Sequence, residues 1–84
     1  MRVYYITFRS VTFAQHAESI LQRAGINCQL QRTPRWMESQ GCGYCVRIKE
    51  QNMQEAVLLL RTQQVPFRKL YLSGENGTME EVNI

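Results

Sequence analysis

The spacing of apolar residues constrains the fold of this chain most, because it switches between the period of a helix and the period of a strand. Between Ser10 and Gly25, apolar side chains recur at offsets of 0, 1, 4, 7, 8 and 11, which places them on one helical face. Ser10 is a suitable N-cap, and Gly25 suits the left-handed position that ends a helix. We therefore predict a helix between them, whose apolar stripe consists of Phe13, Ala14, Ala17, Ile20, Leu21 and Ala24.

Four segments have the character of β-strands. Residues 2–8 are rich in β-branched and aromatic side chains. Residues 26–31 alternate strictly, with apolar residues at the even positions, and residues 44–49 repeat that pattern. Residues 67–72 form the fourth predicted strand. Between the last two strands a second helical spacing ends near Val65-Pro66, and its apolar positions are Met53, Ala56, Val57 and Leu60.

The resulting order, β-α-β-β-α-β, predicts an α+β fold of the ferredoxin-like type. This is a split βαβ sandwich, an antiparallel sheet with two helices on one face. Right-handed crossovers place the first and third strands in the centre, and the second and fourth at the edges. We expect one domain over residues 1–73 and a tail over residues 74–84, in which residues 79–84 either add a short strand or fray.

Composition narrows the classes of function. The 84 residues suffice for one small domain, and the basic residues behind the formal charge of +3 are dispersed, so we expect no nucleic-acid partner. The longest apolar run, residues 56–60, is too short to span a bilayer, and residues 1–9 lack signal-peptide features. We therefore expect a cytoplasmic protein with no membrane partner. With one histidine, no aspartate and no glycine-rich phosphate loop, we expect neither a Ser-His-Asp triad nor a bound cofactor.

Cys42 is the strongest candidate for covalent chemistry. In a reducing compartment, three thiols are more consistent with free, metal-bound or reactive cysteines than with a disulfide framework. Gly41 and Gly43 let the backbone turn sharply and leave the Cys42 sulfur unshielded. A reactive thiolate needs positive charge nearby, and Arg35 and Arg32 are the basic candidates. The alternative is a small buried residue that opens a strand.

Cys45 completes a C-x-x-C pair with Cys42. By alternation it shares a face with Arg47 and Lys49, which we expect to be the open face of the sheet. Cys45 could there be a resolving thiol that attacks a persulfide on Cys42, or a strand-surface residue without a role. The spacing is weak evidence for thioredoxin-like chemistry, because that chemistry places the first cysteine at a helix N-terminus and this motif enters a strand.

Other polar and aromatic residues allow two further interpretations. A zinc site needs four ligands, and the C-x-x-C pair would have to recruit Cys28 and His16. Cys28 falls on the apolar side of its strand and His16 off the apolar stripe of its helix, so we expect no metal within one chain, while a site shared between two chains stays open. Trp36 and Met37 form either a contact surface or a cover over the edge of the core.

Several stretches together resemble one family of small bacterial domains. They are Phe8-Arg9-Ser10, Ala14, Ala17-Glu18, Leu21, Gly25-Ile26, Thr33-Pro34-Arg35 and Gly41-Cys42-Gly43. Over about residues 4–72 the chain is similar to the putative selenium/sulfur carrier-like proteins. The resemblance implies that Cys42 accepts sulfur or selenium as a persulfide or selenopersulfide, with Arg35 as the matching basic residue. It also implies donor and acceptor proteins as partners. Cys45 departs from the family pattern, in which an apolar or small residue is usual.

Three functions follow from these observations. The first is a sulfur or selenium carrier, which we expect to be a carrier protein rather than a turnover catalyst. The second is a non-enzymatic interaction or regulatory module that uses Trp36, Met37 and the basic strand face of Arg47 and Lys49. The third is a metal or redox sensor built on the C-x-x-C pair. A homodimer is compatible with the first two.

Overall fold

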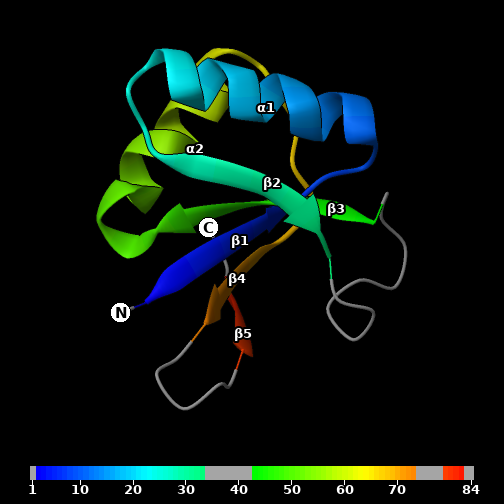
Figure 1. The fold of residues 1–84 in the computed structure, drawn as a ribbon, viewed down its shortest axis with the longest axis vertical. Helices are drawn as coiled ribbons and strands as arrows, with labels where there is room; N and C mark the ends of the chain where they lie inside the picture. The colour runs from blue at the N-terminus through cyan, green and yellow to red at the C-terminus, as the bar shows by residue number, and fades with distance from the viewer. Residues whose placement is uncertain (1, 34–42, 74–78, 83–84) are drawn as a thin grey trace.

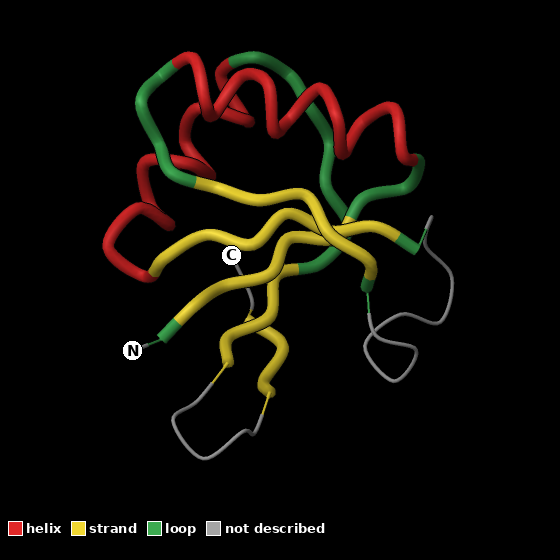
Figure 2. Tube along the Cα trace, in the orientation of Figure 1, coloured by secondary structure: helices red, strands yellow, loops and turns green. Residues whose placement is uncertain are grey.

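The computed structural model describes residues 2–33, 43–73 and 79–82, which form a five-stranded antiparallel sheet and two α-helices (Figure 1). Both helices cover the same face of the sheet (Figure 2). The α+β class is therefore confirmed, with one strand beyond the β-α-β-β-α-β order. In chain order the elements are β1 (Val3–Thr7), α1 (Val11–Arg23), β2 (Cys28–Arg32), β3 (Tyr44–Lys49), a 3-10 turn (Glu50–Asn52), α2 (Met53–Thr62), β4 (Leu70–Ser73) and β5 (Met79–Val82).

The strand order of the sheet is β2-β3-β1-β4-β5. The prediction that the first and third strands are neighbours in the interior is confirmed, and β2 is an edge strand. The prediction that β4 is the other edge is wrong, because β5 pairs with it and places Met79 opposite Ser73. Of the two outcomes expected for the end of the chain, residues 79–82 adopt the extra strand.

The start of α1 follows the capping signal in the sequence. The Oγ of Ser10 accepts a hydrogen bond from the backbone N–H of Phe13 at 3.3 Å. The middle of the predicted stripe is buried, but Phe13 is 37% exposed and Ala24 is also exposed. These two residues occupy the ends of the stripe, and the fully buried positions are confined to the turns between them, at Ala14, Ala17 and Leu21.

Both helices end in the same type of hydrogen-bonded turn. Gly25 after α1 has a φ of +81°, and Gln64 after α2 has a φ of +58°. In each case the next residue, Ile26 or Val65, is buried and donates its N–H back into the last turn of the helix at 2.9 Å. This turn, rather than Val65-Pro66 itself, ends α2 at Thr62. In the described part of the chain, no helix has the length and apolar character needed to cross a membrane.

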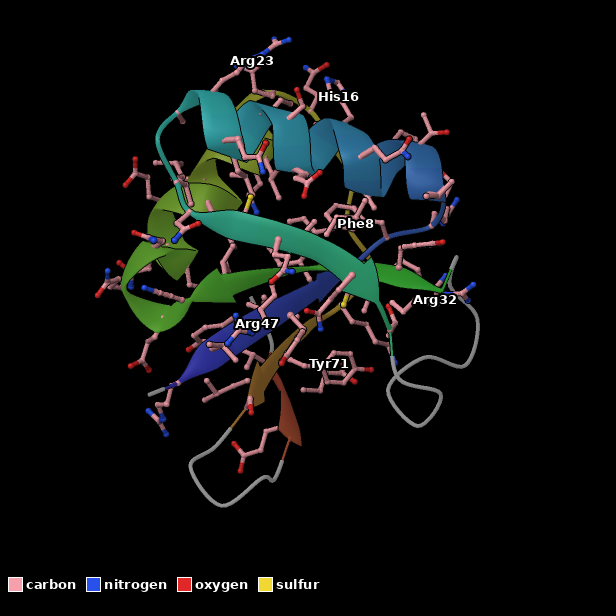
Figure 3. The ribbon with its side chains drawn as sticks, in the orientation of Figure 1. Phe8, His16, Arg23, Arg32, Arg47 and Tyr71 are labelled. Carbon is pink, nitrogen blue, oxygen red and sulfur yellow. The ribbon has the colours of Figure 1, made fainter. Side chains whose placement is uncertain are left out.

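The hydrophobic core lies between the helices and one face of the sheet, which we call the inner face; the opposite face is the outer face. Phe8 is fully buried and lies between α1 and the sheet, whereas His16 and Arg23 point away from the sheet (Figure 3). The even positions of β1 and β3 supply the inner face, as alternation predicts. The buried core cluster consists of Tyr4, Ile6, Phe8, Ala14, Ala17, Leu21, Ile26, Val46, Ile48, Ala56, Leu60, Val65 and Leu70.

The fourth strand begins at Leu70, later than the predicted start at Phe67. A β-bulge accounts for the difference, because Thr7 of β1 faces both Arg68 and Lys69. The N–H of Thr7 donates to the Lys69 carbonyl at 2.9 Å, and the N–H of Arg68 donates to the Thr7 carbonyl at 2.8 Å. The N–H of Lys69 donates to the Thr7 Oγ1 at 3.1 Å. Two residues opposite one interrupt the regular ladder, so the strand starts only beyond them.

Candidate functional site

The candidate site lies where β2 ends and β3 begins. Arg32 is the last residue of β2, and Figure 3 shows it at this end of the sheet. Gly43 directly precedes β3, and Cys45 is the second residue of that strand. The other predicted site residues fall outside the described residues; these are Arg35, Gly41 and Cys42, together with the candidate contact residues Trp36 and Met37.

Gly43 has the backbone conformation that its position in the sequence suggested. Its φ is +83°, a value that residues with a side chain rarely adopt. A β-carbon at this position would meet no atom within 4 Å, so conformation rather than crowding requires glycine. The Gly43 carbonyl accepts a hydrogen bond from the N–H of Thr33 at 2.9 Å. Thr33 and Gly43, which bracket residues 34–42 in the sequence, are therefore hydrogen-bonded to each other.

Arg32 is held by an aromatic side chain that the sequence interpretation did not consider. Arg32 and Tyr44 are register partners on β2 and β3, and the Arg32 guanidinium carbon lies 5.4 Å from the centroid of the Tyr44 ring. This is a cation–π distance. The even positions of both strands share the inner face, so the contact is on the side of the sheet that carries the helices.

Cys45 is on the outer face but is not exposed there. The register pairs it with Thr7 on one side and Gln31 on the other, which confirms the face predicted by alternation. Its side chain is 0% exposed, however, so the expectation of a thiol open to solvent is wrong. Alternation determines the direction of a side chain, whereas exposure also depends on what lies over that face. Arg32 and Cys45 thus lie on opposite faces, which separates the basic group from this thiol.

Cys28 has the properties of a protonated thiol. Burial raises its pKa to about 11 from an ordinary value of 9.0, and the negative charge of Glu18 adds to the rise. The thiol donates a long hydrogen bond, 3.8 Å, to the backbone carbonyl of Glu18. Since the thiolate is the nucleophilic form, Cys28 is poorly suited to attack at neutral pH. This agrees with its predicted place on the apolar side of β2.

Glu18 also contacts the edge strand directly, a role that the apolar pattern does not indicate. Its carboxylate accepts a hydrogen bond from the N–H of Leu30 at 2.9 Å. Because β2 is an edge strand, this contact satisfies a strand N–H that would otherwise be open to another chain. The sequence signal available was a glutamate on the flank of the helix stripe, one position beyond Ala17.

His16 and Cys28, the two residues considered above as additional zinc ligands, lie on different elements of the fold. His16 is exposed and points away from the sheet, whereas Cys28 belongs to the partly buried inner face (Figure 3). Within residues 2–33, 43–73 and 79–82, no group of three or more His, Cys, Asp or Glu side chains could hold a metal ion.

Comparison with known protein families identifies a relationship over most of the chain. The model of a family described as "Putative Se/S carrier protein-like" matches residues 3–72. This span includes both helices, the first three strands, all but the last residue of β4, and the C-x-x-C pair. No curated protein and no solved structure matches the chain.

Proposed function

Because the chain belongs to the Se/S carrier protein-like family, we propose that it carries sulfur or selenium on Cys42 as a persulfide or selenopersulfide. The family match over residues 3–72 is the observation that carries this proposal. We assign the domain to the ferredoxin-like split sandwich, supported by the order β2-β3-β1-β4 and by two helices on one face. A cytoplasmic location is part of the proposal, since a reducing compartment keeps carrier thiols available.

The loading step requires no outside oxidant. The Cys42 thiolate attacks the outer sulfur of a donor persulfide, a new S–S bond forms on Cys42, and the donor S–S bond breaks with its electron pair on the inner sulfur. The donor leaves as a thiolate that takes up a proton. Release reverses the roles, because an acceptor thiolate attacks the outer sulfur and Cys42 leaves as a thiolate. Arg35 is the residue proposed to stabilise the anionic forms.

The environments of the other two cysteines support this choice of nucleophile. Cys28 has a pKa of about 11 and is almost entirely protonated at neutral pH. Cys45 is fully buried, so a role as the resolving thiol would require its exposure during the reaction. We therefore place the transfer step on Cys42 and give Cys45 a packing role next to Thr7. We give Arg32, which contacts Tyr44 at the end of the sheet where β3 begins, the role of an accessory positive charge.

Sulfur loading tests the proposal directly. The full chain is incubated with a cysteine desulfurase and cysteine, and its intact mass is recorded before and after reduction. We expect the added mass of one sulfur atom, removed by dithiothreitol, on the wild type and on Cys28→Ala. Cys42→Ala should remain unmodified. Equal loading of Cys42→Ala, or no loading of the wild type by any persulfide donor, would contradict the carrier function.

The interaction module is kept as a second candidate because of the outer face. Arg47 (Figure 3) and Lys49 lie on this face, with Tyr5 opposite Arg47, so two basic residues follow β3 next to an aromatic side chain. Arginine and tyrosine are enriched in protein interfaces. A Cys42→Ser variant separates the two candidates, since an interaction module should bind its partner unchanged and a carrier should not be loaded.

A further inference from the structure

A cleft lies at the end of the sheet where β1 leads into α1. Its volume is about 550 Å³. One wall comes from the connection between β1 and α1 with the first turn of α1, and the other from the connection between α2 and β4. Figure 2 shows these two connecting segments converging at this end of the sheet. The lining residues are Arg9, Phe13, Pro66, Phe67, Arg68 and Lys69.

The wall formed by residues 66–69 is fixed to the sheet. Thr7 is joined to the backbone of Arg68 and Lys69 by hydrogen bonds of 2.8, 2.9 and 3.1 Å, and its hydroxyl also donates to the Lys69 carbonyl at 3.4 Å. Thr7 is only 3% exposed, so its side chain is largely removed from water. Bulges often redirect side chains next to functional sites. The backbone positions of Arg68 and Lys69 are therefore set by the fold before any ligand arrives.

The charge of the cleft is positive. Lys69 forms an ion pair with Glu81 at 3.4 Å, which offsets one of the three cations. The other ion pair among the described residues joins Arg2 and Glu50, so neither Arg9 nor Arg68 is neutralised by a described carboxylate. The first turn of α1 contains no acidic residue. The guanidinium groups of Arg9 and Arg68 are thus available to bind a doubly charged anion, and their planar arrangement of donors suits such a ligand.

The rest of the lining is apolar. Phe13 is 37% exposed in the cleft, and Phe67 is partly buried against the core, with Pro66 beside it. A bare phosphate or sulfate ion would contact the cations but leave these rings in water. A volume of about 550 Å³ lies in the range that small organic ligands occupy in proteins. The lining therefore fits a molecule that carries a flat ring as well as an anionic group.

We propose that this cleft binds a small organic phosphate, with the phosphate between Arg9 and Arg68 and a ring against Phe13 and Phe67. The inference goes beyond sulfur transfer and does not depend on Cys42. Nucleoside monophosphates combine a dianionic phosphate with a flat ring, and aromatic side chains stack on nucleobases. AMP is therefore a suitable probe for this class of ligand.

The binding test is a titration of the isotope-labelled full chain with AMP, followed by amide NMR shifts. We expect saturable shifts centred on Arg9, Phe13, Phe67 and Arg68, and binding at least about tenfold tighter for AMP than for adenosine or inorganic phosphate. The Cys42→Ala variant should bind AMP equally well, which separates this outcome from failure of the carrier function. No saturation by about 10 mM AMP, or equal binding of inorganic phosphate, would overturn the proposal.

Matched variants locate the site. Removing one charge-assisted contact in Arg9→Gln or Arg68→Gln should weaken AMP binding by about tenfold or more. Arg23→Gln is the control, because Arg23 is an exposed arginine at the far end of α1 and should leave the affinity unchanged. Equal weakening in the control would show binding by net charge alone and would sink the proposal. If an acidic, phenylalanine-containing peptide binds at the same residues more tightly than AMP, the proposal of a small ligand is overturned and the cleft is a site for a protein partner.

Discussion

The guanidinium of Arg32 lies over the ring of Tyr44, 5.4 Å from its centroid, where the paired strands β2 and β3 end and begin. The two residues are opposite each other in the register, and the next pair along the chain, Thr33 and Gly43, is joined by a backbone hydrogen bond of 2.9 Å. Two successive contacts, one between side chains and one between backbones, therefore close the sheet at the base of residues 34–42. This closure positions Gly43, the residue that follows Cys42 in the sequence.

The Arg32–Tyr44 contact should be measurable as a coupling energy. In a double-mutant cycle of Arg32→Gln and Tyr44→Leu, we expect a coupling energy of about 0.5–1 kcal/mol in the free energy of unfolding. This is the value typical of a solvent-exposed cation–π contact, and Arg32 is exposed. Urea denaturation of the four proteins measures it. Arg47→Gln with Tyr44→Leu is the control, since Arg47 is on the outer face and the two effects should add. Additive effects in the Arg32 cycle itself would show that the contact contributes no stability.

The left-handed residue after α2 offers a stabilising substitution. Gln64 has a φ of +58° without being glycine, whereas the equivalent position after α1 is Gly25. We expect Gln64→Gly to raise the free energy of unfolding by about 0.5–1 kcal/mol, because glycine adopts this conformation without the β-carbon clash. Thermal and urea unfolding measure the change. The mirror substitution, Gly25→Ala, should destabilise by a similar amount, and a destabilised Gln64→Gly would indicate that the glutamine side chain makes a needed contact.

The raised pKa of Cys28 predicts a loss of stability at alkaline pH. Between pH 9 and about 11 the unfolded thiol is ionised while the folded thiol keeps its proton, so the folded state binds more protons and its stability falls as pH rises. Urea midpoints measured across this range should decrease less steeply for Cys28→Ala than for the wild type. Alkylation by iodoacetamide should also reach Cys28 only as the pH approaches 11. Rapid alkylation of Cys28 at pH 8 would contradict the assigned pKa.

Glu18 should stabilise the edge strand through its hydrogen bond to Leu30. Glu18→Ala removes the acceptor of the Leu30 N–H and should cost about 1–3 kcal/mol of unfolding free energy. Glu18→Gln keeps an acceptor oxygen and should cost less. Amide hydrogen exchange at Leu30 reports on the bond itself, with faster exchange in Glu18→Ala than in Glu18→Gln. Unchanged exchange in both variants would mean that water or another group satisfies this N–H.

Thr7 should hold the bulge that forms one wall of the cationic cleft. Thr7→Val keeps the shape but removes the hydroxyl that accepts from the Lys69 N–H, so we expect a loss of about 1–3 kcal/mol. Thr12→Val, at an exposed position of α1, is the control and should have little effect. Denaturation gives the stabilities, and amide exchange at Lys69 should accelerate only in Thr7→Val. Equal stability of the two variants would contradict a structural role for the hydroxyl.

Local signals in the sequence predict much of this fold without reference to tertiary contacts. Ser10 and Gly25 bound α1 because capping and the left-handed turn involve residues within a few positions of one another. The even positions of β3 face the helices because alternation follows from strand geometry alone. The positive φ at Gly43 is a further feature that a local signal predicts, because a glycine next to a strand indicates a sharp turn of the backbone.

The tertiary structure decided what depends on residues far apart in the chain. Cys45 lies on the predicted face, but its burial depends on what covers that face, which alternation cannot report. Folding brings Tyr44 to Arg32 and sets Thr7 opposite the residues that precede β4. It also raises the pKa of Cys28, first by burying the thiol and then by placing Glu18 beside it. Sequence periodicity determines the direction in which each side chain of a helix or strand points. The exposure of a side chain, its protonation state and the residue at which a strand begins depend on neighbours that only tertiary packing brings into contact.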